Sequence, residues 1–140
     1  MLISVNLNNI AAQAVAQIKA ELPTRAMQAA HILKNSSQEI LGHEGGGGKT
    51  YRKPAGGTYQ ASAPGSPPAM RTGTLMRSWR PIVYGEYNPG LEGGTPYAGY
   101  LEYGTPGGMI APRPYIDKIV ELSEPEITAI YNVPYDISIT

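Results

Sequence analysis

The stretch YAGYLEYGT, from Tyr97 to Thr105, is the most informative part of this chain for its fold. Its spacing predicts a short helix, capped by Thr95 and Pro96, whose alanine and leucine point inward. Gly104 follows as a residue that can adopt the left-handed conformation in which many helices end. The tyrosines recur every third residue and therefore share one side of this helix; they are Tyr97, Tyr100 and Tyr103.

Glu102 is the acidic residue of this stretch and lies near the expected helix end. A carboxylate is unfavourable there unless a cation is close, because a helix C-terminus carries partial negative charge. Arg113, which opens the following stretch RPYI, is the candidate partner, and a bidentate pair with Glu102 would orient the chain as it enters the last helix. Two interpretations stay open: a corner that presents the tyrosine edge to a neighbouring molecule, or a clamp that acts only within the chain.

The N-terminal part of the chain has a helical pattern. Apolar residues recur at helical spacing over residues 10–41, on a face rich in alanine that suits close packing on a sheet. Asn8 or Asn9 is the expected cap, and Gly42 is the expected terminator. Because Pro23 removes a backbone donor, the pattern predicts one long kinked helix or two helices in line.

Residues 43–71 are predicted to be a flexible loop. They contain the runs GGGG at 45–48, GG at 56–57 and PGSPP at 64–68. A connection this long and this rich in glycine and proline is unusual inside a compact domain. Such loops are functional or disordered, and in an oligomer they often become ordered only against a neighbour.

The remaining elements are expected to be short, and the whole chain is expected to form one α+β domain over residues 1–140. Its architecture would be a small, mostly antiparallel sheet packed against the long N-terminal helix and a C-terminal helix. The expected pieces are a strand at 2–7, a helix capped by Thr72, a strand at Pro81–Tyr84, a turn region at 86–94, a helix after Pro114 that Pro125 interrupts, and a strand at 133–139.

The composition offers little for catalysis. The chain has no cysteine and two histidines, His31 and His43, which lack the helical spacing of a zinc hydrolase. The segment GGGGKT at 45–50 has His43 where a phosphate loop needs glycine, and it follows a helix rather than a strand. No apolar run reaches membrane-spanning length. We therefore expect no enzyme activity, no metal, no cofactor and no membrane association.

Charge is unevenly distributed along a chain whose net charge is zero. Residues 49–80 contain bases and no acid, namely Lys49, Arg52, Lys53, Arg71, Arg77 and Arg80. Residues 81–140 contain two bases, Arg113 and Lys118, against the acids Glu86, Glu92, Glu102, Asp117, Glu121, Glu124, Glu126 and Asp136. Two such blocks can attract copies of the chain head to tail, or they can neutralise each other within one subunit.

Four short sequence pieces occur in a characteristic order over residues 64–116: PGSPP, TGTLMRS, YAGYLEYGT and RPYI. In this order the chain resembles the gene-ten-like family of head–tail joining and tail-completion proteins of long-tailed double-stranded DNA phages. Besides the tyrosine edge, the residues that match the pattern and are expected to be structural are Pro67, Pro68, Thr72, Gly73, Leu75, Ser78, Gly104, Thr105 and Pro114.

The resemblance implies a structural virion protein, made in the cytoplasm of a bacterial host and located in the tail or neck. It implies a homo-oligomeric ring, with six subunits expected, that binds tail-tube or tail-terminator and head-completion proteins. DNA would pass through its channel without specific binding, since phosphate contacts would slow passage. Tail completion and neck adaptor both remain open. The residues expected at interfaces are Lys49, Arg52, Lys53, Tyr97, Tyr100, Glu102, Tyr103 and Arg113.

An alternative from another class is a nucleic-acid-binding module. The basic 49–80 segment would contact phosphates, and Tyr51, Tyr59 and Trp79 would stack on bases. Sharply salt-dependent retention of DNA would favour this alternative, whereas elution as a ring without DNA affinity would favour assembly.

Overall fold

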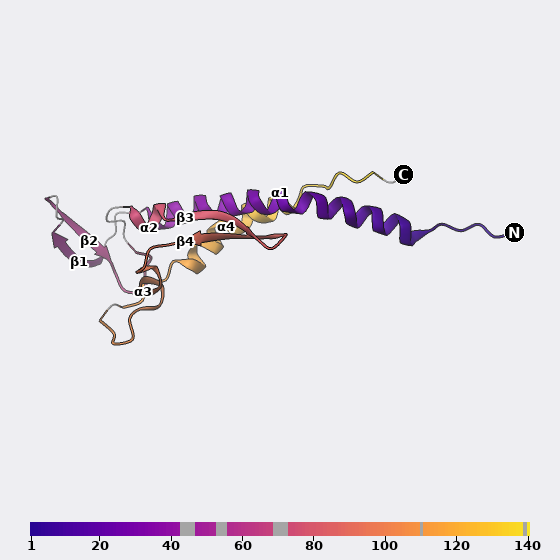
Figure 1. Cartoon of the computed structure of the whole chain (residues 1–140). Coiled ribbons are helices and arrows are strands. Elements are labelled where there is room, and N and C mark those ends of the chain that lie inside the picture. Colours follow the sequence, from indigo (N-terminus) through magenta and orange to yellow (C-terminus); the bar gives the residue numbers. More distant parts are fainter. Residues whose placement is uncertain (43–46, 53–55, 69–72, 110, 139) are drawn as a thin grey trace.

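A long helix, α1, spans the molecule, and the other elements lie along it (Figure 1). The structure is a computed structural model that describes residues 1–42, 47–52, 56–68, 73–109, 111–138 and 140. The expected α+β class is confirmed by two larger helices and two antiparallel hairpins. In chain order the elements are α1 (Leu7–Leu41), β1 (Gly47–Arg52), β2 (Thr58–Ser62), α2 (Thr74–Arg77), β3 (Trp79–Tyr84), β4 (Asn88–Gly93), α3 (Ala98–Tyr103) and α4 (Ile116–Asn132).

Helix α1 is continuous, so the single-helix interpretation is the correct one. Its cap is Asn6, whose Oδ1 accepts the backbone N–H of Asn9 at 3.1 Å, and not Asn8 or Asn9 as expected. Residues 1–6 are irregular, so the expected strand at 2–7 is wrong. The helix runs through Pro23 and ends at Gly42, as predicted. Its 35 residues give a length of about 52 Å.

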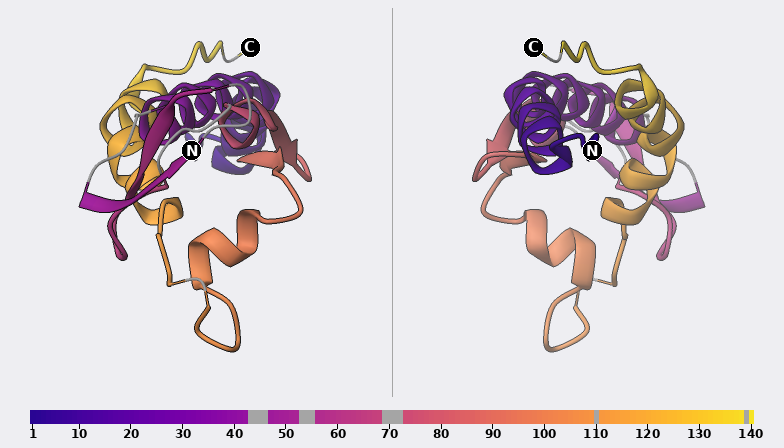
Figure 2. Two further views of the ribbon diagram at one scale, coloured as in Figure 1. Left: turned by 90° about the vertical axis from the view of Figure 1, so that its left-hand side faces the viewer. Right: turned by 90° about the vertical axis from the view of Figure 1, so that its right-hand side faces the viewer.

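Small side chains form the buried face of α1. Ala26, Ala29 and Ala30 have no exposed surface. Figure 2, with α1 seen end-on, shows α4 on one side of it and the β3–β4 hairpin on the other, and α1 contacts all three elements. Methyl side chains let these neighbours approach the helix axis closely. The expected packing of an alanine-rich helix face on a sheet is thereby confirmed.

The β3–β4 hairpin is the sheet that packs on α1. Its register runs from Trp79 opposite Gly93 to Tyr84 opposite Asn88. The expected strand at Pro81–Tyr84 is confirmed, but residues 86–94 are more than a turn, because 88–93 form β4. Pairing with β3 supplies backbone hydrogen bonds that the Gly- and Pro-rich composition of β4 did not predict. Gly93 has a φ of +117° and lies against the Ser78 carbonyl, which leaves room for glycine alone.

The β1–β2 hairpin corrects the prediction that residues 43–71 lack regular structure. Thr50, Tyr51 and Arg52 pair with Gln60, Tyr59 and Thr58 respectively. Gly56 and Gly57, both at positive φ, lie between the two strands. The glycine and proline content of residues 43–71 favoured a loop prediction, although the segment contains two runs of β-forming residues on either side of a glycine turn, which is the pattern of a hairpin. This hairpin pairs only with itself among the described strands and projects from one end of the molecule (Figure 1).

Helices α3 and α4 follow the β3–β4 hairpin. Gly104 ends α3 as predicted, although its φ of +78° and ψ of 175° differ from the left-handed helical conformation that was expected. Thr95 and Pro96 do not form its cap, since α3 begins after Tyr97 and the Thr95 carbonyl accepts the Ala98 N–H at 3.0 Å. Helix α4 runs through Pro125 without ending there. Residues 133–138 are not a strand, contrary to expectation, and they run alongside α1 instead.

Candidate functional site

The core of the molecule brings three of the four sequence pieces together at one corner. Leu41 of α1 packs with Leu75 of α2, Ala98 of α3, and Tyr115 and Ile119 at the start of α4. These side chains are each at most 9% exposed. The pieces TGTLMRS, YAGYLEYGT and RPYI therefore share one cluster, which we call the motif corner.

Backbone hydrogen bonds bring the fourth piece, PGSPP, to the same corner. The Gly65 N–H donates to the Pro112 carbonyl at 2.8 Å, and the Arg113 N–H donates to the Leu101 carbonyl at 2.6 Å. The segment just before α4 thus lies between PGSPP and α3 and binds both. Residues that are distant in the sequence therefore converge at the motif corner.

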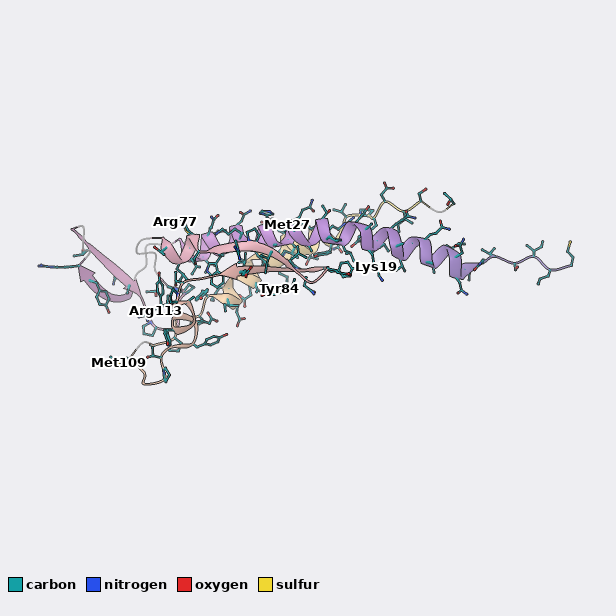
Figure 3. The ribbon with its side chains drawn as sticks, in the orientation of Figure 1. Lys19, Met27, Arg77, Tyr84, Met109 and Arg113 are labelled. Atoms are coloured by element: carbon teal, nitrogen blue, oxygen red, sulfur yellow. The ribbon has the colours of Figure 1, made fainter. Side chains whose placement is uncertain are left out.

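Arg113 does not pair with Glu102, so this expectation is wrong. Its guanidinium donates from Nε to the Ser62 carbonyl at 3.3 Å and from Nη1 to the Ala111 carbonyl at 3.1 Å. These bonds join the end of the β1–β2 hairpin to the segment before α4. Arg113 therefore links the end of β2 to the segment before α4, and Figure 3 shows it between the hairpin and the α3 region.

Glu102 caps α4 instead. Its Oε2 accepts the N–H of Tyr115 at 2.7 Å and the N–H of Ile116 at 3.2 Å. The N-terminus of a helix has unpaired N–H groups and partial positive charge, and both favour a carboxylate. Tyr115, the N-cap residue by position, makes no side-chain cap bond of its own. Glu102 of α3 thus accepts two N–H groups at the start of α4 for which the local sequence of α4 provides no side-chain acceptor.

Tyr115 is the central buried side chain of the motif corner. It is 2% exposed, and its hydroxyl donates to the Ala98 carbonyl at 2.9 Å. Burial, the charge of Glu102 and the nearby Tyr103 raise the pKa of the Tyr115 hydroxyl to about 12. Its ring lies 6.4 Å from that of Trp79 at a tilt of 58°. The hydroxyl therefore stays protonated at neutral pH and acts as a structural donor.

Most of the other residues that match the family pattern are buried or half-buried. Gly73 precedes α2 at a φ of +77°, and the Ser78 hydroxyl donates to the Leu75 carbonyl at 2.6 Å. Pro68 is buried, and Pro67, Thr105 and Pro114 are half-buried. Thr72 lies outside the described residues, so its expected capping role has no observation. The expectation that these residues hold the corner together stays a prediction.

The expected tyrosine edge is exposed. Tyr97, Tyr100 and Tyr103 are 43%, 51% and 76% exposed, and Met109 in the loop beyond is 92% exposed. Figure 2 shows α3 and this loop standing away from α1, and Figure 3 shows Met109 on the outside of the loop. Amphipathic rings on a projecting element suit a surface that becomes buried against a partner. The same helix points Ala98 into the motif corner, so the core positions this edge.

The charge blocks are partly neutralised within the subunit. Arg80 and Glu92, which face each other across β3 and β4, form an ion pair at 3.1 Å. Glu102 is also engaged, as the cap of α4. Arg52 is exposed on the projecting β1–β2 hairpin, whereas the Lys49 side chain and Lys53 lie outside the described residues. Attraction between the blocks of two copies stays a prediction for the charges that remain.

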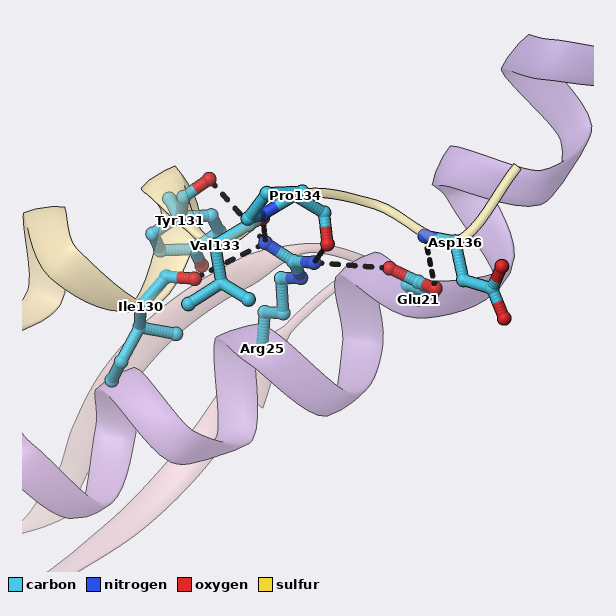
Figure 4. A network of polar contacts seen from close by, with 7 residues as sticks. All are labelled: Glu21, Arg25, Ile130, Tyr131, Val133, Pro134 and Asp136. Atoms are coloured by element: carbon cyan, nitrogen blue, oxygen red, sulfur yellow. Dashed lines mark hydrogen bonds and ion pairs between the residues drawn. The ribbon is translucent and has the colours of Figure 1, made fainter.

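Arg25 is an important residue that the sequence analysis missed. Its side chain is about 10% exposed. It donates to the carbonyls of Ile130, Tyr131 and Pro134 at 3.2, 3.4 and 3.1 Å respectively, and also to the carbonyl of Val133 (Figure 4). It also pairs with Glu21 at 3.1 Å and lies 3.7 Å over the Tyr135 ring. These bonds satisfy carbonyls at the end of α4, where a cation is favoured. Spacing offered no signal, because these partners are more than 100 residues away.

Other kinds of site find no support in the described part of the chain. Its histidines, aspartates and glutamates form no cluster that could hold a metal. None of its helices is long and apolar enough to cross a membrane. In the comparisons with known proteins, no family model, curated protein or solved structure matches this chain.

Proposed function

We propose that this protein is a structural component of a tailed-phage virion that forms a ring at the tail end or the head–tail interface, completes the tail and joins it to the head. The proposal begins from the resemblance of residues 64–116 to the gene-ten-like family. The observation that carries it further is the convergence of the four pieces on one corner that positions an exposed tyrosine edge.

The mechanism in this proposal is mechanical. Each copy buries its tyrosine edge and part of its charged surface against the next copy, through two different patches. Such an interface closes into a ring when the rotation between copies fits. Six copies would match the symmetry that the resemblance implies, and the ring would bind tail-tube or tail-terminator proteins on one side and head-completion proteins on the other. DNA would pass through the channel without specific binding, and no catalytic step, cofactor or membrane takes part.

Electron microscopy of particles from the phage that encodes this sequence tests the proposal. Antibodies raised against the purified protein should label one end of each tail, at or near the junction with the head. Labelling that is absent from intact particles, although the protein is abundant in infected cells, would contradict a structural role.

A nucleic-acid-binding module remains the second candidate, and one observation limits it. Trp79 is partly buried against Tyr115 at the motif corner, so it is not placed to stack on a base. Arg52 and Tyr51 on the projecting hairpin are exposed and keep this alternative testable. Steep loss of DNA retention with added salt would support it.

A further inference from the structure

A row of polar side chains on α1 holds the segment that follows α4. The row consists of Gln13, Gln17, Glu21 and Arg25, which are four residues apart and therefore lie on one side of the helix. The segment, which we call the tail, begins at Pro134 and is described through residue 138 and at residue 140. Each member of the row bonds to the backbone of a different tail residue.

The two glutamines bond to the tail as a neighbouring strand would. The Gln17 amide donates to the Ser138 carbonyl at 2.5 Å and accepts the Ser138 N–H at 2.6 Å. The Gln13 amide donates to the Thr140 carbonyl at 3.1 Å and accepts the Thr140 N–H at 3.0 Å. Each amide thus satisfies both backbone groups of one residue.

The two charged members match the backbone groups that they face. Glu21, whose carboxylate accepts only, takes the N–H of Asp136 at 3.1 Å (Figure 4). Arg25, which donates only, bonds to the carbonyl of Pro134 at 3.1 Å, and proline has no N–H that would need an acceptor.

The spacing and the chemistry together select one register. Four residues of helix advance about 6 Å, and two residues of extended chain advance about 6.6 Å, so the two repeats stay matched over a few steps. A shift of the tail by two residues would place Pro134 opposite Glu21, where the carboxylate would find no donor. The row therefore recognises an extended backbone with proline at one defined position.

We propose that the row is a docking site for the tail of a second copy of this chain, which replaces the chain's own tail by exchange. Bonds in the exchanged form are the same as those within one copy, so exchange requires little more than a change at the hinge. That hinge is Val133, an extended residue directly after α4, whose carbonyl must leave Arg25 when the tail exchanges.

Three features of the structure favour a second copy as the occupant. The pattern of donors and acceptors on the row fits the sequence that begins at Pro134, which every copy carries. Asp136, Ser138 and Thr140 are exposed even when docked, so the main apolar surface that release of the tail uncovers is the half-buried Tyr135 ring over Arg25. Figure 1 shows α1 extending past the β3–β4 hairpin toward its N-terminus with the tail alongside, so an incoming tail approaches an open side of the helix. The inference goes beyond the proposed function, because it concerns the isolated protein and needs no virion.

Intermolecular paramagnetic broadening tests the exchange, and the absence of cysteine allows one specific spin label. One full-length chain carries the label on Ala20→Cys, at an exposed position beside Glu21. A second full-length chain is labelled with ¹⁵N and carries no nitroxide. Because a tethered tail has a high effective concentration for its own row, the mixture is studied near millimolar concentration. The expected result is loss of intensity for the ¹⁵N amide signals of tail residues 135–138 and 140, while amides far from the tail keep theirs.

Variants that block each half of the contact sharpen the test. The spin-labelled chain also carries Ser138→Pro, which removes the N–H that Gln17 accepts, and the ¹⁵N chain carries Gln13→Ala with Gln17→Ala. Neither chain then holds its own tail well, but the row of the first can bind the tail of the second, so broadening should increase. Adding Gln13→Ala and Gln17→Ala to the spin-labelled chain should abolish it. The control substitutions Gln28→Ala and Gln38→Ala, at exposed positions elsewhere on α1 of the spin-labelled chain, should leave the broadening unchanged. Broadening that is absent, unselective or unchanged by loss of the row overturns the proposal.

Discussion

Replacing Glu102 by alanine should weaken the whole motif corner, although the side chain itself is only partly buried. The change removes the acceptor of the Tyr115 and Ile116 N–H groups, which are 2.7 and 3.2 Å from Oε2. Loss of a helix cap costs about 0.5–2 kcal/mol, and loss of a carboxylate at a helix N-terminus adds about 0.3–1 kcal/mol. We expect the free energy of unfolding to fall by about 2 kcal/mol and Tm by roughly 4–8 °C.

Urea unfolding followed by tryptophan fluorescence measures this effect where it arises. Trp79 is the one tryptophan of the chain, and its ring lies 6.4 Å from Tyr115. Glu102→Gln keeps a neutral acceptor and should cost about half as much. The matched control is Glu121→Ala, which removes an exposed glutamate from α4 and should change stability by less than about 0.5 kcal/mol. If Glu102→Ala is no more destabilising than Glu121→Ala, Glu102 is not the cap of α4.

Three further changes probe other contacts. Because the pKa of the Tyr115 hydroxyl is raised from 10 to about 12, its contribution to the free energy of unfolding is present below pH 10 and is lost as the pH rises through 12. Tyr115→Phe should lower the free energy of unfolding by about 1 kcal/mol at neutral pH. Urea titrations of this variant should show a smaller loss of stability at alkaline pH than those of the wild type. Arg25→Met leaves carbonyls at the end of α4 without their donor and should lower the free energy of unfolding by about 2–4 kcal/mol, whereas Lys19→Met, at an exposed site on α1, should leave calorimetric Tm nearly unchanged. Reversal of Lys49, Arg52 and Lys53 to glutamate should slow assembly in light scattering and make it less sensitive to salt, while equal rates at every salt concentration would exclude these charges from the interface.

Elements that depend on local pattern were predictable from the sequence. The periodicity of α1, its stop at Gly42 and the stop of α3 at Gly104 follow from residues that are neighbours in the chain. The side of α3 that carries the tyrosines could also be predicted, because helical spacing places residues three apart on one side.

Elements that depend on distant partners were not predictable in the same way. β4 is poor in strand-forming residues and exists because β3 pairs with it. Glu102 was expected to need a cation, but the start of α4, brought close by the fold, offers two N–H groups instead. For Arg25, the carbonyls at the end of α4 become partners only once α4 packs on α1. In each case the sequence indicated the chemistry of the residue but did not identify its partner.

The central claim is that the motif corner positions a tyrosine edge through which copies of the chain assemble. Native mass spectrometry over a range of concentrations tests it most directly, with wild-type protein compared with Tyr100→Ser combined with Tyr103→Ser. Both side chains are more than half exposed, so the variant should keep the wild-type Tm. We predict one closed oligomer of defined subunit number for the wild type and monomers for the variant. A wild type that stays monomeric, or a variant that forms the same oligomer, would contradict the claim.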